Sequence, residues 1–263
     1  MLIASLGSSF AAGPGIPPIV ERAAGRSGSN YAHLLAERLG ARLIDLTVSG
    51  ATTQTVLRET QRVGRRVFPP QIRGVPPDSD LVTVTVGGND LGFAASVLAA
   101  AIATRRARRT ITRPFAASML RRVAPGHADA DVARAAAGLA EIAAAVRDRA
   151  QNARVVLVDY VTIFGDETTP SRLAPFRVAD IERFREVQEA LQHAFGLAAA
   201  RAGVGLLRAS ALSRDHGLGS REPWIFGYRE AGARTASFHP NALAMRHIAD
   251  ALVELTGRTG APS

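Results

Sequence analysis

The sequence contains no cysteine and no lysine, and it has no long hydrophobic run. Without cysteine the chain forms no disulfide, no thiolate zinc site and no cysteine nucleophile. Its longest nearly apolar stretch, from Phe93 to Ala103, falls well short of the roughly 20 residues that span a bilayer. The residues after Met1 lack the basic region and cleavage site of a secretory signal. We therefore expect a cytoplasmic protein, or a secreted one whose leader lies outside this sequence.

The rest of the composition indicates an ordinary folded domain. The 263 residues are 47% apolar and 21% charged, which is the balance of a globular chain. This length suits one α/β domain, and no repeat, linker or low-complexity tract divides it. We therefore expect a single domain over 1–263, acting as a monomer.

Short β-rich runs alternate with helical patterns along the chain. Strands are expected at 2–6, 42–46, 81–86, 155–158 and 205–207, and helices at 30–39, 131–151, 180–201 and 240 to about 255. Strands separated by helices form parallel βαβ units. The pattern predicts an α/β fold, a three-layer α/β/α sandwich around a parallel sheet of about five strands. Because ligands bind beyond the carboxyl ends of such strands, a functional site is expected in the loops there.

Four loops carry residues suited to acyl transfer. Ser9 follows the first strand in a Ser/Gly-rich turn, whose N–H groups can stabilise an oxyanion. Gly50 follows the second strand and Asn89, an amide donor, follows the third. His239, an imidazole of a type that titrates near neutrality, stands just before the last helix. Taken singly, each of these residues is as readily explained by a turn, a cap or the surface.

Together the four loops resemble those of the SGNH hydrolases, the GDSL-type esterases and lipases. The most specific pieces are Ser-Gly-Ala-Thr-Thr at 49–53, Val-Gly-Gly-Asn-Asp-Leu-Gly-Phe at 86–93 and His-Pro-Asn at 239–241. The resemblance covers residues 2 to about 252 and is greatest to the secreted lipase and phospholipase branch. It implies a flavodoxin-like hydrolase fold without cofactor or metal. It also implies Ser9 as the nucleophile, His239 as the general base, and an oxyanion hole made by Ser9, Gly50 and Asn89.

Two carboxylates of the family pattern are absent. Ser8 stands where the family has an aspartate before the nucleophile, and Ala236 stands where it has one three positions before the histidine. Disabling the acid that orients the histidine can cost up to about 10⁴-fold in a triad. A backbone carbonyl can accept the Nδ1 proton instead, so we predict a Ser9–His239 dyad with the Ala236 main-chain oxygen as its third member. A distant acid such as Asp215, or loss of turnover altogether, are the alternatives.

Three further residues have weaker roles. Trp224, the only tryptophan, precedes His239 in a long loop and is expected to wall a substrate pocket, with simple packing as the alternative. Asp90 is expected to fix the third loop through hydrogen bonds, and Asp159 to cap a helix.

The positive charge is concentrated in one segment. Arginine alone supplies the 32 bases, which against 23 acids give a net charge of +9. Between Leu91 and Ala128, where no acid occurs, stand Arg105, Arg106, Arg108, Arg109, Arg113, Arg121 and Arg122. This arginine-rich segment, at about 93–128, is expected to form an apolar helix with a basic end. It is either a solvated face, or an inserted cap that meets amphiphilic substrates or an anionic membrane surface, or a polyanion-binding surface. It lacks the interleaved aromatics of a base-stacking surface, so no nucleic-acid partner is expected.

We therefore predict a serine hydrolase that cleaves carboxylic esters of small molecules or lipids. A carbohydrate acetyl esterase or an acyl thioesterase is the first alternative, because the same residues serve those acyl groups. A non-catalytic protein that binds polyanions or membranes on a hydrolase scaffold is the second.

Overall fold

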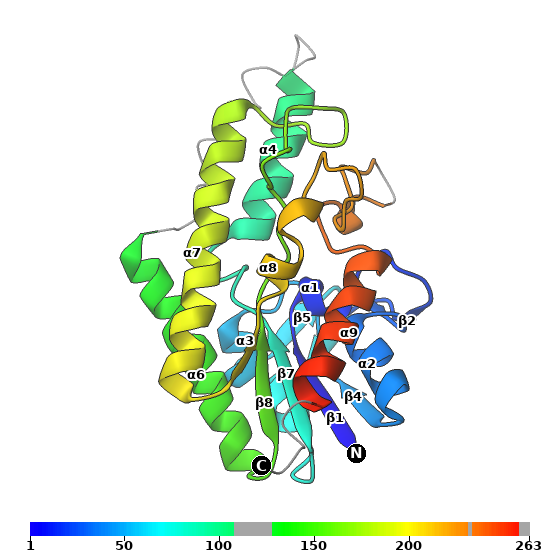
Figure 1. The fold of residues 1–263 in the computed structure, drawn as a ribbon, viewed down its shortest axis with the longest axis vertical. Coiled ribbons are helices and arrows are strands. Elements are labelled where there is room, and N and C mark those ends of the chain that lie inside the picture. The colour runs from blue at the N-terminus through cyan, green and yellow to red at the C-terminus, as the bar shows by residue number, and fades with distance from the viewer. Residues whose placement is uncertain (108–127, 231–232, 258–263) are drawn as a thin grey trace.

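The protein is built on a five-stranded, wholly parallel sheet. The computed structural model describes residues 1–107, 128–230 and 233–257. The strand order is β4-β1-β7-β8-β9 (Figure 1). The bounds are β1 (Leu2–Gly7), β4 (Arg42–Asp45), β7 (Leu81–Thr85), β8 (Arg154–Val158) and β9 (Gly205–Leu207). Each boundary agrees with the sequence prediction to within one residue.

Helices cover both faces of the sheet. On one face α2 (Tyr31–Leu39) packs against α9 (Ala242–Gly257), and on the other α6 (Asp129–Arg149) packs against α7 (Val178–Ala202) (Figure 1). The central strands β1 and β7 are therefore buried along their whole length, which fits sequences made of apolar residues and small hydroxyl residues. The three-layer prediction is confirmed.

The ends of α2 show why the sequence marks its limits. Asn30 caps the helix by accepting the His33 N–H at 3.0 Å, and Gly40 ends it in the left-handed conformation with φ 57°. The Gly40 N–H then satisfies the carbonyls of the last turn.

Shorter elements fill the connections. Two small antiparallel ribbons pair β2 (Ile19–Glu21) with β3 (Arg26–Ser27) and β5 (Gln61–Val63) with β6 (Arg66–Phe68). The remaining helical segments are α1 (Ser9–Ala12), α3 (Thr53–Leu57), η1 (Gln71–Gly74), α4 (Phe93–Ala107), α8 (Ala209–Leu212), η3 (Arg214–His216) and η4 (Arg234–Ala236).

The arginine-rich segment is only partly within the described residues. Its first part forms the predicted helix α4, with Arg105 and Arg106 in the last turn. Arg105 pairs with Glu230, and its guanidinium lies 4.9 Å from the centroid of the Tyr228 ring. The other five arginines of the segment lie outside the described residues, so the cap remains a prediction. Among the described helices, none combines the length and apolar character that crossing a membrane requires.

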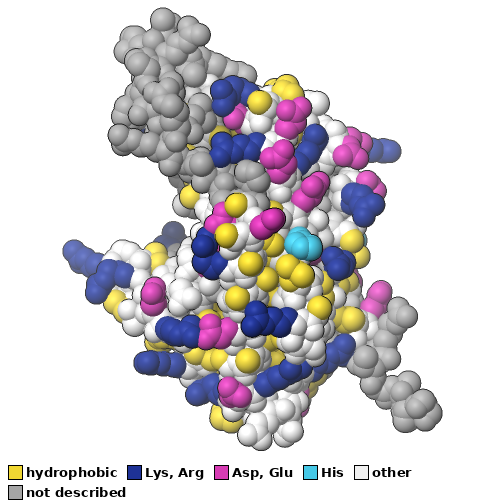
Figure 2. All heavy atoms as spheres, turned by 90° about the vertical axis from the view of Figure 1, so that its left-hand side faces the viewer, with side chains coloured by type: hydrophobic (Ala, Val, Ile, Leu, Met, Phe, Trp, Pro, Cys, Tyr) yellow, Lys and Arg dark blue, Asp and Glu magenta, His cyan; other side chains and the backbone are white. Residues whose placement is uncertain are grey.

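The face turned toward the viewer in Figure 2 carries arginine and acidic side chains interspersed over its surface. Interspersed charges of both signs are typical of a solvated surface.

Candidate active site

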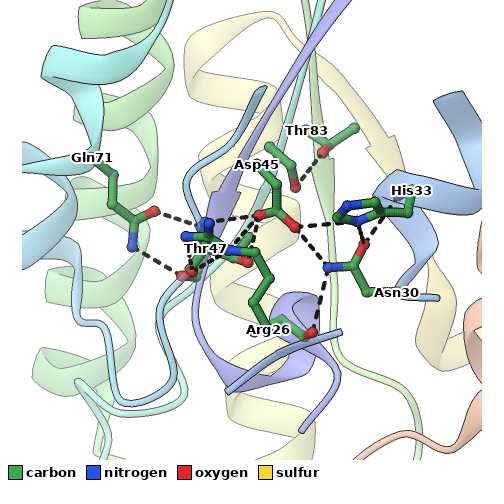
Figure 3. A network of polar contacts seen from close by, with 10 residues as sticks. Arg26, Asn30, His33, Asp45, Thr47, Gln71 and Thr83 are labelled. Carbon is green, nitrogen blue, oxygen red and sulfur yellow. Dashed lines mark hydrogen bonds and ion pairs between the residues drawn. The ribbon is translucent and has the colours of Figure 1, made fainter. Parts of the chain in front are cut away.

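Ser9 lies at the carboxyl end of the central strand β1, where the chain turns into α1. Gly7 permits this turn, because a Cβ atom there would come within 2.5 Å of the Thr85 carbonyl oxygen on β7. The Ser8 N–H donates to the same carbonyl oxygen at 2.8 Å. On the other side, the Gln71 amide bonds both the N–H and the C=O of Gly7, at 2.8 and 3.0 Å (Figure 3). The turn is thus fixed from both sides.

His239 reaches Ser9 from the far end of the chain. Its Nε2 atom lies 2.8 Å from the Ser9 Oγ atom. A short antiparallel pairing holds it there. The Phe226 N–H donates to the His239 carbonyl at 2.9 Å, the Phe238 N–H donates to the Phe226 carbonyl at 2.8 Å, and Ile225 forms a bridge with Pro240. The structure therefore brings together the two residues that the sequence paired.

The carbonyl nearest the imidazole is that of Ser237, one residue after the predicted Ala236, and the Ala236 carbonyl also acts on the ring. The Nδ1 atom of His239 lies 2.9 Å from the Ser237 carbonyl oxygen. The Ala236 carbonyl accepts the backbone N–H of His239 at 3.3 Å, and it also acts to raise the pKa of the imidazole. The reason is Phe238, whose φ of 62° is left-handed and bends the chain so that the Ser237 carbonyl faces the ring. Asp215 is not among the groups that shift the pKa of His239.

These contacts fix the protonation of the imidazole. A carbonyl only accepts hydrogen bonds, so Nδ1 carries the proton and Nε2 is the acceptor for the Ser9 hydroxyl. Burial lowers the pKa of His239 to about 4, while the carbonyls of Ser237 and Ala236 act in the opposite direction. The expectation of titration near neutrality is thus wrong for this site. His239 is neutral near pH 7, with a free lone pair on Nε2.

The loop after β4, which carries Gly50, and the loop after β7, which carries Asn89, are joined by hydrogen bonds. The Asn89 amide nitrogen donates to the Ala51 carbonyl at 2.8 Å, and Gly50 adopts a left-handed φ of 84°. The carboxylate of Asp90 accepts from the Thr53 hydroxyl at 2.6 Å and from the Thr53 N–H at 3.1 Å. Burial raises the pKa of Asp90, while these Thr53 hydrogen bonds lower it. The predicted hydrogen-bonding role of Asp90 is confirmed.

Trp224 packs within the protein. It is 4% exposed, and its indole lies between the rings of His216 and His247, with centroids at 4.3 and 4.4 Å and interplanar angles of 10° and 3°. Because both faces of the indole are covered, neither is free to wall a substrate pocket, so the packing alternative describes Trp224.

Asp159 bonds the first turn of α8 from outside the helix, whose N-cap residue is Arg208. Its carboxylate accepts from the N–H and the hydroxyl of Ser210 in α8, at 2.8 and 2.6 Å. Burial raises the pKa of Asp159 to about 6, opposed by these Ser210 hydrogen bonds.

A polar network behind the nucleophile turn was not predicted. The Asn30 amide donates to the Asp45 carboxylate at 2.8 Å and to the Ala12 carbonyl at 3.4 Å, and Arg26 donates to the Thr47 carbonyl at 2.8 Å (Figure 3). It ties the end of α1 to the end of β4. Its members come from three separate segments, around residues 12, 26–30 and 45–47, and form no motif, so only the fold reveals them.

The described residues contain no group of three or more His, Asp or Glu arranged to hold a metal ion.

A serine hydroxyl bonded to a neutral imidazole, at the carboxyl edge of a parallel sheet, is the arrangement of a serine hydrolase. The sequence pattern of the GDSL-like lipase/acylhydrolase family matches residues 5–247. The chain belongs to this family and is a carboxylic-ester hydrolase.

Three known proteins similar to the chain come from Streptomyces species. Lipase 2 of Streptomyces coelicolor is 30% identical, over 96% of this chain and 85% of that protein. The crystal structure of phospholipase A1 from Streptomyces albidoflavus NA297 has a TM-score of 0.69 at 20% identity, covering 98% of this chain and 99% of that one. The extracellular lipase from Streptomyces rimosus has a TM-score of 0.68 at 22% identity, with coverage of 97% and 99%. At these identities the two structures establish the shared fold.

Proposed function

We propose that the protein hydrolyses carboxylic esters through an acyl-enzyme on Ser9. The observation that carries this proposal is the 2.8 Å hydrogen bond between Ser9 Oγ and His239 Nε2. His239 takes the hydroxyl proton as Oγ bonds to the ester carbonyl carbon, and it then gives that proton to the departing alcohol. In the second half, His239 deprotonates a water molecule, which attacks the acyl-enzyme. The carboxylic acid leaves and Ser9 regains its proton.

The oxyanion of each tetrahedral intermediate is met by the N–H groups of Ser9 and Gly50 and by the Asn89 amide. Two features support this assignment. The N–H groups of Ser9 and Gly50 donate to no acceptor within the described part of the chain. The Asn89 amide nitrogen carries two hydrogens, of which the Ala51 carbonyl takes one, so the other is available to substrate.

The third member of the site is the Ser237 carbonyl, which replaces a carboxylate. It accepts the Nδ1 proton at 2.9 Å and so holds the tautomer that leaves Nε2 free. It supplies a dipole in place of a full charge, so the imidazolium formed during the reaction is stabilised less than in a triad with an aspartate.

Lipids or other esters of modest acyl chain length are the proposed substrates, and the 30% identity to a protein named Lipase 2 supports this class. A cap over 93–128 that contacts an anionic membrane surface transiently fits the same proposal, because arginine attracts anionic headgroups.

The test is a series of p-nitrophenyl esters from acetate to palmitate. The wild type is expected to turn over some of them and to be labelled on Ser9 by a fluorophosphonate, while Ser9→Ala and His239→Ala lose activity and stay folded. Ser79→Ala is the matched control. Ser79 is also a buried serine, but it lies just before β7, at the amino ends of the strands and away from Ser9. Full activity in Ser9→Ala would refute the proposal. Salt-sensitive polyanion binding without any labelling would support the non-catalytic alternative.

A further inference from the structure

Ser8, which stands in place of the family's aspartate, is paired with a buried tyrosine. The Ser8 Oγ atom lies 3.0 Å from the Tyr160 Oη atom, and the two side chains are 1% and 2% exposed. Tyr160 follows the end of β8, so it reaches across β7 to the nucleophile turn at the end of β1. A neutral hydroxyl pair thus occupies the position where a carboxylate is expected.

The same phenol oxygen holds the third loop. The Gly88 N–H donates to Tyr160 Oη at 3.1 Å. A Cβ atom at Gly88 would lie 2.8 to 2.9 Å from the Tyr160 ring and hydroxyl, so only glycine admits this ring. One oxygen therefore contacts the residue before Ser9 and the residue before Asn89.

The phenol is rigidly placed. Its ring packs at 4.5 Å from Phe10 and 6.0 Å from Phe195, centroid to centroid, and Phe10 in turn lies 5.3 Å from the His239 ring. Burial raises the pKa of Tyr160 to about 12, so the hydroxyl stays neutral and keeps its proton near pH 7.

We propose that Tyr160 is a positioning residue in place of the missing aspartate. It links the turn that carries Ser9, through Ser8, to the loop that carries Asn89, through Gly88. This inference rests on the proposed function. The Ser9 N–H and the Asn89 amide must converge on one substrate oxygen, and each belongs to the residue directly after one that Tyr160 anchors. A donor displaced by about 1 Å loses much of its effect on the transition state. A fixed link between the two loops keeps that geometry.

Tyr160→Phe tests the inference, because it removes only the hydroxyl and keeps the ring packing. The expected result is a fall in kcat of about 10- to 100-fold with KM little changed, and a slower labelling of Ser9 by a fluorophosphonate. Tyr31→Phe is the matched control. Tyr31 is also fully buried, with its hydroxyl 3.0 Å from Thr85 Oγ1, so its loss is expected to lower Tm and leave kcat unchanged.

Ser8→Ala shows whether Tyr160 acts through Ser8. If the two hydroxyls form one bridge, the Ser8→Ala/Tyr160→Phe double variant has a kcat no lower than that of the less active single variant. Independent losses that multiply would contradict a shared bridge. A kcat in Tyr160→Phe equal to that of Tyr31→Phe, with only Tm lowered, would overturn the inference and leave a structural role.

Amide hydrogen exchange gives a readout that does not depend on activity. In Tyr160→Phe the Gly88 amide and the amides of the Ser8–Ser9 turn are expected to exchange faster, whereas in Tyr31→Phe they are not. Unchanged exchange in Tyr160→Phe overturns the inference even in an active enzyme. An inactive wild type with accelerated exchange in the variant would refute the proposed function alone and uphold the link between the loops.

Discussion

The Nδ1 atom of His239 is bonded to the main-chain oxygen of Ser237, two residues earlier in the same loop. The group that orients the imidazole is therefore part of the backbone that carries it. No carboxylate appears among the groups that shift the pKa of His239, so its titration is governed by burial. An acid in that position would raise the pKa, and its absence leaves the imidazole neutral over a wide range of pH.

The first prediction concerns the acid limb of activity. Because burial lowers the pKa of His239 to about 4, the free base persists well below neutrality. We expect kcat/KM to be steady as pH falls from 7 and to drop only as it passes through about 4. The measurement is a pH profile of kcat/KM on a neutral ester, limited to pH values where the fold persists by circular dichroism. A limb centred near 6.5, the ordinary value of histidine, would contradict the burial argument.

The second prediction concerns Asn89. Asn89→Ala removes the amide proposed as an oxyanion donor and also the bond to the Ala51 carbonyl. We expect kcat to fall by about 10² to 10³, with a much smaller change in KM, because the lost interaction strengthens in the transition state. Asn152→Ala is the control. Asn152 is exposed and lies between α6 and β8, at the amino ends of the strands and away from the site. Equal kcat in the two variants would remove Asn89 from the oxyanion hole.

The fold was predictable because local signals agree with one another. Buried strands such as β7 are rich in β-branched residues, and α2 is bounded by an N-capping asparagine and a C-terminal glycine. The ribbons β2–β3 and β5–β6 escaped prediction because they are only two or three residues long and largely exposed, so they show no alternating apolar pattern.

The site was predictable as far as residue types determine it. Ser9 and His239 carry groups that local sequence identifies, and the parallel sheet brings them to one edge. The Ser237 carbonyl at Nδ1 was missed beside the predicted Ala236 carbonyl, because its position depends on the left-handed φ of Phe238, which a phenylalanine rarely adopts. The pKa of His239 and the contact of Tyr160 with Ser8 depend on burial and long-range packing, which no local pattern encodes.

The third prediction is that restoring the family's aspartate does not raise activity. A Cβ atom on Gly15 would come within 2.4 Å of the Ala236 Cβ, so the side chain at 236 points toward the Gly15 loop, and it is 2% exposed. Ala236→Asp would bury a carboxylate without reaching Nδ1, which is already bonded to Ser237. We expect kcat not to rise and the free energy of unfolding to fall by about 2 kcal/mol or more.

Urea denaturation and ester turnover measure both effects of Ala236→Asp. Thr235→Asp is the control, because Thr235 is exposed and adjacent, so the same charge there should leave stability nearly unchanged. A gain of activity in Ala236→Asp would mean that the loop rearranges to form a triad.

The fourth prediction separates Asp159 and His239 by the sign of their pH dependence. Burial raises the pKa of Asp159 from 3.8 to about 6, so the folded protein holds this proton to higher pH than the unfolded chain does. The contribution of Asp159 to stability is therefore full below about 3.8 and declines as pH rises toward about 6. His239 has the opposite sign. Its pKa falls from 6.5 to about 4, so its contribution is full above 6.5 and is lost as pH falls toward 4.

Asp159→Asn isolates the first of these effects, because an amide keeps hydrogen-bonding groups toward Ser210 without titrating. The difference in unfolding free energy between Asp159→Asn and the wild type is expected to move in favour of the variant as pH rises from about 4 to about 6, and to be level above that range. Asp166→Asn, a change at a carboxylate on an exposed loop, is the control. A difference that stays constant across this range would mean that Asp159 is ionised in the folded protein throughout, and that its two bonds to Ser210 outweigh the cost of burying the charge.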